Sequence, residues 1–152
     1  MNTNPKNNIF KSYGLFWKNF FNFKGRTRRS DFWNATIINV IIEAILSVIY
    51  AIALNSGNSD YTAVLNDIEN QPITADQPIL LIAIALIAIY AIAIIIPCVA
   101  MIVRRLHDIG KTGWLILLSL VPCIGAIILF VFEVMDSEKG ENKYGVSDKY
   151  IS

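Results

Sequence analysis

Three long apolar runs dominate the pattern of hydrophobic and polar positions along the chain. They cover residues 32–54, 79–103 and 114–134, and none contains more than one charged side chain. A helix needs about 20 mainly apolar residues to cross about 30 Å of hydrocarbon. Because lipid offers no hydrogen-bond partner to a bare backbone, such spans must be helical. The pattern predicts an all-α integral membrane protein, a three-helix transmembrane bundle.

The third run is interrupted by Pro122 and Gly125 near its middle. Membrane helices tolerate proline as a kink, and a full third crossing would put the polar tail, residues 135–152, on the outer side. The same two residues would also let the chain turn back as a re-entrant hairpin, which would return the tail to the cytoplasm. We expect the full crossing and keep the hairpin as the alternative.

A different pattern precedes the first run, over residues 9–23. Phe10, Gly14, Trp17 and Phe21 recur at helical spacing, and two lysines fall elsewhere on the helical wheel. This pattern is typical of an amphipathic helix that lies in the membrane interface, with aromatic rings at headgroup depth. The alternative is a cytosolic arm that packs on the bundle.

The composition agrees with a membrane protein of one domain. The 152 residues are 55% hydrophobic and 16% charged, whereas a typical soluble domain is about 45–50% apolar and about 25% charged. The mean hydropathy is +0.50. A net charge of +1 gives no reason to expect a nucleic-acid partner.

The charges are distributed unevenly along the chain. The first 31 residues hold seven Lys and Arg, whereas the segment 55–77 holds none and carries four acidic side chains. Lys and Arg concentrate in the cytoplasmic loops of membrane proteins. We therefore expect a cytoplasmic N-terminus and an acidic external loop over residues 55–77.

The densest polar cluster follows the second run, over residues 104–114, with the sequence Arg-Arg-Leu-His-Asp-Ile-Gly-Lys-Thr-Gly-Trp. Arg104 and Asp108 are four apart, so a helix would let them pair on one face. Thr112 is placed to cap the third helix. One interpretation is structural, since arginines at a helix end anchor the topology and snorkel. The other is a site for an anionic headgroup or phosphorylated ligand, because Arg binds phosphate bidentately.

A second basic cluster precedes the first run and lies on the same side of the membrane in this topology. It contains three arginines and a tryptophan, and Ser30 or Asp31 is placed to cap the first helix. The two clusters together predict one composite arginine patch. Its candidate members for binding anionic lipid or a partner are Arg26, Arg28, Arg29, Trp33, Arg104, Arg105, His107, Asp108, Lys111 and Trp114.

A polar stripe crosses the first run at helical spacing, formed by Thr36, Asn39, Glu43, Ser47 and Tyr50. A charge near the bilayer centre costs roughly 2.5 kcal/mol or more. We therefore expect the Glu43 carboxyl to be protonated and hydrogen-bonded, or to face another subunit. The stripe is interpreted as contact between helices or subunits, with a transport path as the alternative. The bonding partners considered are Tyr90 and Ser119.

Three short motifs make the chain similar to a known family. They are Gly-Arg-x-x-Arg-x-x-x-Trp at Gly25, Arg26, Arg29 and Trp33; the cluster at residues 104–114, with Thr112 where the family has Ser; and Asn-x-Tyr-Gly at Asn142, Tyr144 and Gly145. The chain resembles, over about residues 13–145, the small bacterial membrane proteins grouped as domain of unknown function 805. The resemblance implies a small helical bundle in the bacterial cytoplasmic (inner) membrane and no established reaction.

No catalytic pattern is found in the sequence. The single histidine excludes a multi-histidine metal site, and the two cysteines lack ligand spacing. We expect no catalytic residue, no metal and no cofactor. The leading hypothesis is a non-enzymatic accessory or interaction subunit whose cytoplasmic arginine patch binds anionic lipid or a partner protein. The alternative is an oligomeric small transporter or channel that uses the stripe around Glu43, so a homo-oligomer or larger complex is also expected.

Overall fold

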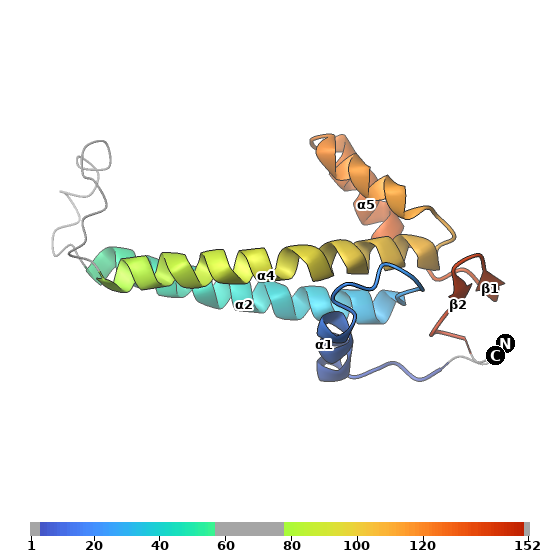
Figure 1. Ribbon diagram of the computed structural model, residues 1–152, viewed down its shortest axis with the longest axis horizontal. Coiled ribbons are helices and arrows are strands. Elements are labelled where there is room, and N and C mark those ends of the chain that lie inside the picture. The colour runs from blue at the N-terminus through green and yellow to red at the C-terminus, as the bar shows by residue number, and fades with distance from the viewer. Residues whose placement is uncertain (1–3, 57–77, 151–152) are drawn as a thin grey trace. The chain divides into compact units, whose positions relative to one another are not determined.

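The computed structural model describes residues 4–56 and 78–150, so nearly all of the predicted external loop over residues 55–77 lies outside the described residues. The described elements, in chain order, are α1 (Ile9–Lys18), α2 (Arg29–Ser56), α4 (Pro78–Asp108), the 3-10 helix η1 (Gly113–Leu120), α5 (Ile124–Val134), β1 (Glu141–Asn142) and β2 (Gly145–Val146) (Figure 1). The chain divides into two units. The motif unit comprises Met1–Ile38 with Ile94–Ser152, and the helix-pair unit comprises Asn39–Ala93.

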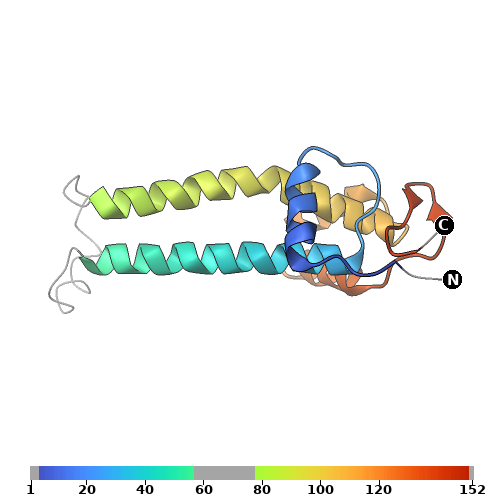
Figure 2. The ribbon, with the colours of Figure 1, turned by 90° about the horizontal axis from the view of Figure 1, so that it is seen from below.

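The helix-pair unit consists of the parts of α2 and α4 that lie between residues 39 and 93. The two helices run antiparallel, side by side (Figures 1 and 2). Ala53, Leu80 and Ala83 are buried between them, and small side chains of this kind let membrane helices approach closely. The Tyr90 hydroxyl donates a hydrogen bond to Asn39 Oδ1 at 2.9 Å, which adds a polar contact to the packing.

Two helices among the described residues are long and apolar enough to cross a membrane. They are Arg29–Leu54 and Pro78–Asp108, with mean hydropathies of 2.4 and 3.3, and only 11% of the most apolar stretch of each is buried. Large apolar surfaces of this kind are rare on soluble monomers. The helices predicted for residues 32–54 and 79–103 fall within α2 and α4.

The third apolar run differs from the prediction of one continuous helix over residues 114–134, which is wrong. The 3-10 helix η1 ends at Leu120, and α5 starts at Ile124 after a turn in which Cys123 has a φ of 60°. Proline lacks the N–H that would continue the helix through Pro122. A Cβ on buried Gly125 would lie 1.7 Å from the Leu118 carbonyl oxygen, so α5 packs directly on η1. The chain therefore turns back on itself between η1 and α5.

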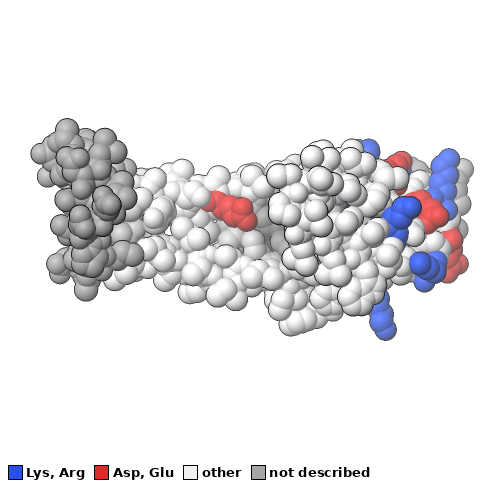
Figure 3. All heavy atoms as spheres, turned by 90° about the horizontal axis from the view of Figure 1, so that it is seen from above, with Lys and Arg blue, Asp and Glu red and all other residues white. Residues whose placement is uncertain are grey.

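The tail is folded rather than extended from the last helix. Strands β1 and β2 pair antiparallel, with Glu141 opposite Val146. The Glu138 N–H donates to the Asp108 carbonyl at 2.8 Å, and the Asn4 N–H donates to the Lys149 carbonyl at 2.8 Å. The tail therefore lies against the end of α4 and the N-terminal arm. Figure 3 shows charged side chains gathering at this end of the motif unit.

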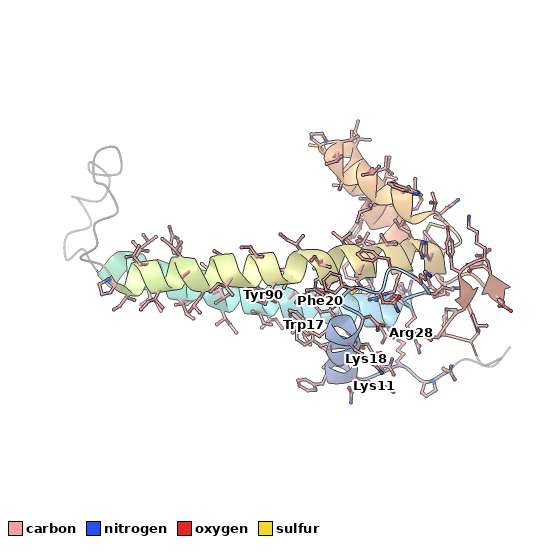
Figure 4. The ribbon with its side chains drawn as sticks, viewed as in Figure 1. Lys11, Trp17, Lys18, Phe20, Arg28 and Tyr90 are labelled. Carbon is pink, nitrogen blue, oxygen red and sulfur yellow. The ribbon has the colours of Figure 1, made fainter. Side chains whose placement is uncertain are left out.

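Helix α1 is shorter than the predicted 9–23 and ends at Lys18. Asn8 caps it by accepting a hydrogen bond from the Lys11 N–H at 2.7 Å. Its face with Ser12 and Phe16 is buried, and Phe16 packs in a core with residues of α2 and α4, namely Phe32, Ala35 and Met101. Phe10, by contrast, is 80% exposed. The helix thus packs on the rest of the motif unit, as in the alternative interpretation, and keeps an exposed face; Figure 4 labels Lys11, Trp17, Lys18 and Phe20 around it.

Candidate functional site

The centre of the motif unit is the buried carboxylate of Asp108. Its Oδ1 accepts hydrogen bonds from Arg26 Nε at 3.0 Å and Ser147 Oγ at 2.8 Å. Its Oδ2 accepts from Arg105 Nη1 at 2.6 Å and Ser137 Oγ at 2.5 Å. A carboxylate has about four acceptor positions, so these four donors saturate it.

The end of α4 fixes the position of Asp108. Gly110 has a φ of 74°, a backbone conformation that favours glycine. It lets the Gly110 N–H bond to the His107 carbonyl at 3.1 Å and the Lys111 N–H to the Leu106 carbonyl at 2.9 Å. This arrangement caps the carboxyl-terminal end of a helix. A Cβ on Gly110 would lie 2.5 Å from Glu138 Oε2, the end of an exposed side chain in the tail.

Arg26 uses its whole guanidinium to join three segments. Besides the Asp108 carboxylate, it donates to the Asp108 carbonyl at 3.0 Å and the Glu138 carbonyl at 2.6 Å. Its Nη1 donates to the carbonyls of Gly140 at 2.8 Å and Gly145 at 3.0 Å. An arginine has five N–H donors, and all five are engaged. Arg26 therefore ties the loop before α2 to the end of α4 and to the tail hairpin.

Arg105 joins the same carboxylate to the end of the α5 hairpin. Its Nε donates to the Glu133 carbonyl at 3.1 Å and its Nη2 to the Met135 carbonyl. The ion pair with Asp108 is between residues three apart on α4. The predicted pair between Arg104 and Asp108 is therefore wrong. Arg105, three positions before Asp108, lies on the same face of α4 as the aspartate.

Arg104 points instead to the loop after α1. Its Nη1 donates to the carbonyls of Asn19 at 2.9 Å and Asn22 at 2.8 Å, and its Nε donates to Thr27 Oγ1 at 3.1 Å. The Thr27 N–H donates back to the Arg104 carbonyl at 3.1 Å. Arg104 thus holds the loop between α1 and α2 in place.

Asp31 and Arg28 anchor the N-terminal arm. The buried Asp31 carboxylate accepts two bonds from Asn7 Nδ2, at 3.2 and 3.0 Å, and one from Ser12 Oγ at 2.8 Å. Arg28 Nη1 donates to the Pro5 carbonyl at 2.9 Å; Figure 4 labels this arginine. The predicted cap of the first helix has a different outcome here, because Asp31 lies inside the first turn of α2 and bonds the arm.

His107 lies inside the same assembly. Its ring stacks on that of Tyr144, with centroids 3.7 Å apart and planes 9° apart. Its Nδ1 lies 3.2 Å from the Gly25 carbonyl oxygen, and its own carbonyl accepts from Asn142 Nδ2 at 3.0 Å. General acid–base catalysis needs the base within reach of a substrate proton. Here the ring joins the Gly25 loop to the tail.

The remaining predicted patch residues are more accessible. Trp114 is 77% exposed, and Lys111 and Arg29 are exposed too. Arg29 Nη1 donates to the Val134 carbonyl at 3.1 Å. Trp33 is half-buried and packs edge-on against Phe130, 5.9 Å between centroids. Of the ten predicted patch residues, six are buried and build the motif unit, Trp33 is half-buried, and the other three are exposed on the surface; the buried ones are Arg26, Arg28, Arg104, Arg105, His107 and Asp108.

The residues of the predicted polar stripe make separate contacts in α2. Thr36 and Ser47 bond back to the carbonyls of their own helix, at Phe32 (2.9 Å) and Glu43 (2.8 Å). Asn39 is buried and accepts from Tyr90, as described above. The Glu43 side chain is exposed and makes no hydrogen bond within residues 4–56 and 78–150.

Sequence reasoning missed the contribution of the tail. Ser137 and Ser147 are buried donors to Asp108, and they stand in a segment expected to be a polar extension. The signal that pointed to this segment was the Asn-x-Tyr-Gly motif. Its Asn142 and Tyr144 bind His107, and Gly145, with a φ of 105°, supplies a carbonyl to Arg26. All three family motifs therefore meet around one aspartate.

Comparison with known proteins covers the same part of the chain. The family described as "Protein of unknown function (DUF805)" matches residues 20–146, which include all three motifs. The chain is 33% identical to inner membrane protein YhaI of Escherichia coli (strain K12) over 135 residues, 89% of this chain and 92% of YhaI. It is 30% identical to inner membrane protein YhaH of the same strain over 132 residues, 87% and 91% of the two chains. No solved structure matches it significantly.

Proposed function

This chain belongs to the membrane protein family of unknown function DUF805, and we propose that it is a non-enzymatic accessory or interaction subunit of the inner membrane. In this proposal the motif unit is a folded platform on the cytoplasmic side. Its exposed cationic surface binds anionic lipid headgroups and so fixes how the platform is presented to a partner protein.

The proposed topology has two crossings, α2 and α4, and a hairpin of η1 and α5 that enters and leaves the membrane on one side. The excess of Lys and Arg in the N-terminal arm supports a cytoplasmic position for that arm. The hydrogen bonds of Asn4 to Lys149 and Asp148 support the same side for the tail. A hairpin, unlike a third crossing, is consistent with both.

The observation that carries the proposal is the division of the arginines. The four that are buried donate mainly to backbone carbonyls and to Asp108, which gives the motif unit a rigid interior. Arg29, Lys111 and Trp114 remain exposed near the ends of α5, α4 and η1. Tryptophan favours the membrane interface, and a cation near an anionic membrane surface is worth about 1 kcal/mol.

The test is native mass spectrometry of the full chain extracted into detergent and loaded with phosphatidylglycerol. We expect the double variant Arg29→Gln with Lys111→Gln to retain fewer phosphatidylglycerol molecules than the wild type. The matched control, Lys6→Gln with Lys139→Gln, removes the same number of positive charges at two exposed lysines elsewhere in the chain. Equal retention by all three proteins would refute the proposed lipid surface.

A second candidate function rests on Glu43. An exposed carboxyl without a partner in the described residues, on a helix that crosses hydrocarbon, favours contact with a second subunit. An oligomer joined at this face would bring several Glu43 side chains together, as a small transporter or channel requires. Its test is proton flux into vesicles that contain the chain, which should depend on Glu43 and disappear in Glu43→Leu.

A further inference from the structure

The motif unit contains a pocket that the proposed lipid surface does not use. It has a volume of about 280 Å³ and lies between α1, the loop that follows it, the start of α2, the end of α4 and the tail. Ligand pockets in proteins are typically about 300–1,000 Å³. The volume therefore suits one small polar group rather than an acyl chain. The charged side chains in its wall are Lys24, Arg26, Asp31, Arg104 and Asp148.

One part of the wall offers positive charge with free donors. Arg104 is only 5% exposed, and its Nε and Nη1 are engaged, but its Nη2 has no partner within the described residues. Lys24 is exposed, and its ammonium group also has no hydrogen-bond partner there. Guanidinium and ammonium donors in one pocket are suited to a phosphate.

The charge balance of the interior supports an anionic group beside Arg104. Four arginines are buried in the motif unit, at positions 26, 28, 104 and 105, against the two buried aspartates Asp31 and Asp108. Buried charge is costly unless it is paired. Arg26 and Arg105 share the single negative charge of Asp108. Arg104 donates hydrogen bonds only to neutral acceptors, and the charge that acts on it is that of Asp148, which lines the same pocket.

Another part of the wall offers negative charge. The Asp148 side chain accepts no hydrogen bond within the described residues, and the buried Asp31 carboxylate lines the same pocket. Partial burial, and then the neighbouring charges of Asp31 and Asp108, raise the pKa of the Asp148 carboxyl. A cation between two such carboxylates would relieve their repulsion. A primary ammonium has three donors and no acceptor, which fits this part of the wall.

The pocket also lies beside exposed aromatic side chains. Phe21, in the loop that contributes Asn19, Asn22 and Lys24 to the wall, is 70% exposed. Aromatic side chains of this kind are enriched at headgroup depth. Figure 4 shows Trp17 and Phe20 at the end of α1 that leads into this loop.

We propose that this pocket binds an aminoalkyl phosphate, with the phosphate at Arg104 and Lys24 and the primary ammonium at Asp31 and Asp148. Two sources supply this chemistry: the headgroup of phosphatidylethanolamine, and a soluble ester such as glycerophosphoethanolamine. The ligand is zwitterionic, so it differs from the anionic lipids of the Arg29 and Lys111 surface. The two sites share no cationic side chain.

The test uses the full chain in nanodiscs of phosphatidylcholine that contain either phosphatidylethanolamine or phosphatidylglycerol, with lipid enrichment measured after extraction by native mass spectrometry. Phosphatidylcholine has the same phosphate but no N–H donor, and phosphatidylglycerol has no amine. We expect the wild type to enrich phosphatidylethanolamine, and Asp148→Asn to reduce that enrichment by about tenfold, because one charged hydrogen bond is lost. Lys24→Gln should weaken it as well.

The control variant Glu141→Gln removes an exposed carboxylate outside the pocket and should bind as the wild type does. No enrichment of phosphatidylethanolamine over phosphatidylcholine, or enrichment unchanged in both Asp148→Asn and Lys24→Gln, would overturn the proposal. Competition by glycerophosphoethanolamine would assign the soluble source, and its failure to compete with the enriched lipid would assign the headgroup. Arg29→Gln with Lys111→Gln should leave this enrichment intact, so the two proposed sites fail separately.

Discussion

Two carboxylates show how differently the two units of this chain treat the same chemical group. In the motif unit, Asp108 is fully buried and accepts four hydrogen bonds, two of them from arginines. In the helix-pair unit, Glu43 is exposed and its side chain has no bonding partner among the described residues. The first carboxylate holds its own unit together. The second makes no hydrogen bond to any described residue, so its partner would have to come from outside the described chain.

The difference extends to how each unit is held together. The helix-pair unit packs through small and apolar side chains such as Ala53 and Ala83, and Asn39 and Tyr90 add a polar contact. The motif unit has small apolar clusters, and segments far apart in sequence are joined by guanidinium groups that bond to backbone carbonyls. The buried charges of the motif unit therefore have partners within that unit, whereas the carboxyl of Glu43 in the helix-pair unit has none among the described residues.

The largest expected effect comes from removing the charge of Asp108. Asp108→Asn leaves Arg26 and Arg105 buried without their counter-ion, and breaking a buried pair in this way costs about 3–5 kcal/mol. We expect the tail to detach and the free energy of unfolding to fall by that amount. Limited proteolysis of the tail and urea unfolding in detergent measure both. Glu141→Gln, at an exposed carboxylate, is the control, and equal stability of the two variants would contradict the central role of Asp108.

The second effect comes from the hairpin. Gly125→Ala places a Cβ 1.7 Å from the Leu118 carbonyl oxygen, so α5 must move away from η1. Overpacking of this kind costs about 1–3 kcal/mol, occasionally more. Because Arg105 bonds to carbonyls at the end of α5, we expect the shift to loosen the motif unit as well, measured by hydrogen exchange of the tail amides.

Gly14→Ala is the matched control for the hairpin. Gly14 lies inside α1, and a Cβ there would meet nothing within 4 Å. Replacing a helical glycine by alanine gains about 0.5–1 kcal/mol. The two substitutions should therefore have opposite signs, and a neutral Gly125→Ala would mean that α5 and η1 are not in close contact.

Much of the fold could be predicted because hydrophobic length and helix periodicity are local signals. The ranges 32–54 and 79–103 fall inside α2 and α4, and Thr112 caps η1 as expected. The hairpin was only an alternative, since Pro122 is compatible with either a kink or a break. What decides it is the close approach at Gly125, a contact between two segments that no local pattern contains.

The site could be predicted only as a set of residues. The motifs identified Arg26, Arg105 and Asp108 as members of one cluster, because both basic clusters are predicted to lie on the same side of the membrane. Sequence spacing alone could not show that these side chains are buried inside the motif unit and not exposed on its surface. That outcome depends on Ser137 and Ser147, which reach the aspartate from the folded tail, a contact between distant segments that no local pattern contains.

The third effect tests the carboxyl of Glu43. Unlike the change at Asp108, its removal should not destabilise the isolated chain. Glu43→Leu removes an exposed carboxyl from a membrane helix, so we expect the isolated chain to insert and fold at least as well. If a second subunit contacts Glu43, the oligomer should weaken by about 0.6 kcal/mol, the average for polar contacts between membrane helices, and by no more than about 1.7 kcal/mol. Subunit photobleaching steps in vesicles measure this. Glu43→Gln, which keeps a hydrogen-bonding group, should retain most of the oligomer.

The smallest effect belongs to an ion pair on the surface of the motif unit. Lys149 donates to the Asp136 carboxylate, but 56% of the Asp136 side chain and 24% of the Lys149 side chain are exposed. Exposed pairs contribute about 0.2–1 kcal/mol, because water and salt screen them. Asp136→Asn should therefore reduce stability by at most about a third of the effect of Asp108→Asn, although both changes remove an ion-paired aspartate.

The pH dependence of stability shows whether the ion pair between Lys149 and Asp136 contributes a small stabilisation or none. The hydrogen bond from Lys149 lowers the pKa of Asp136 below its ordinary value of 3.8, and the same bond raises the pKa of Lys149 above its ordinary value of 10.5. The pair therefore stabilises the fold between those two values. Its contribution is lost as the pH falls through the lowered pKa of Asp136, or rises through the raised pKa of Lys149. Urea unfolding measures the stability difference between the wild type and Asp136→Asn. This difference should be present at neutral pH and vanish at pH values below the pKa of Asp136. A difference that persists in acid would have to come from the hydrogen bond that Asp136 accepts from the Ser137 N–H.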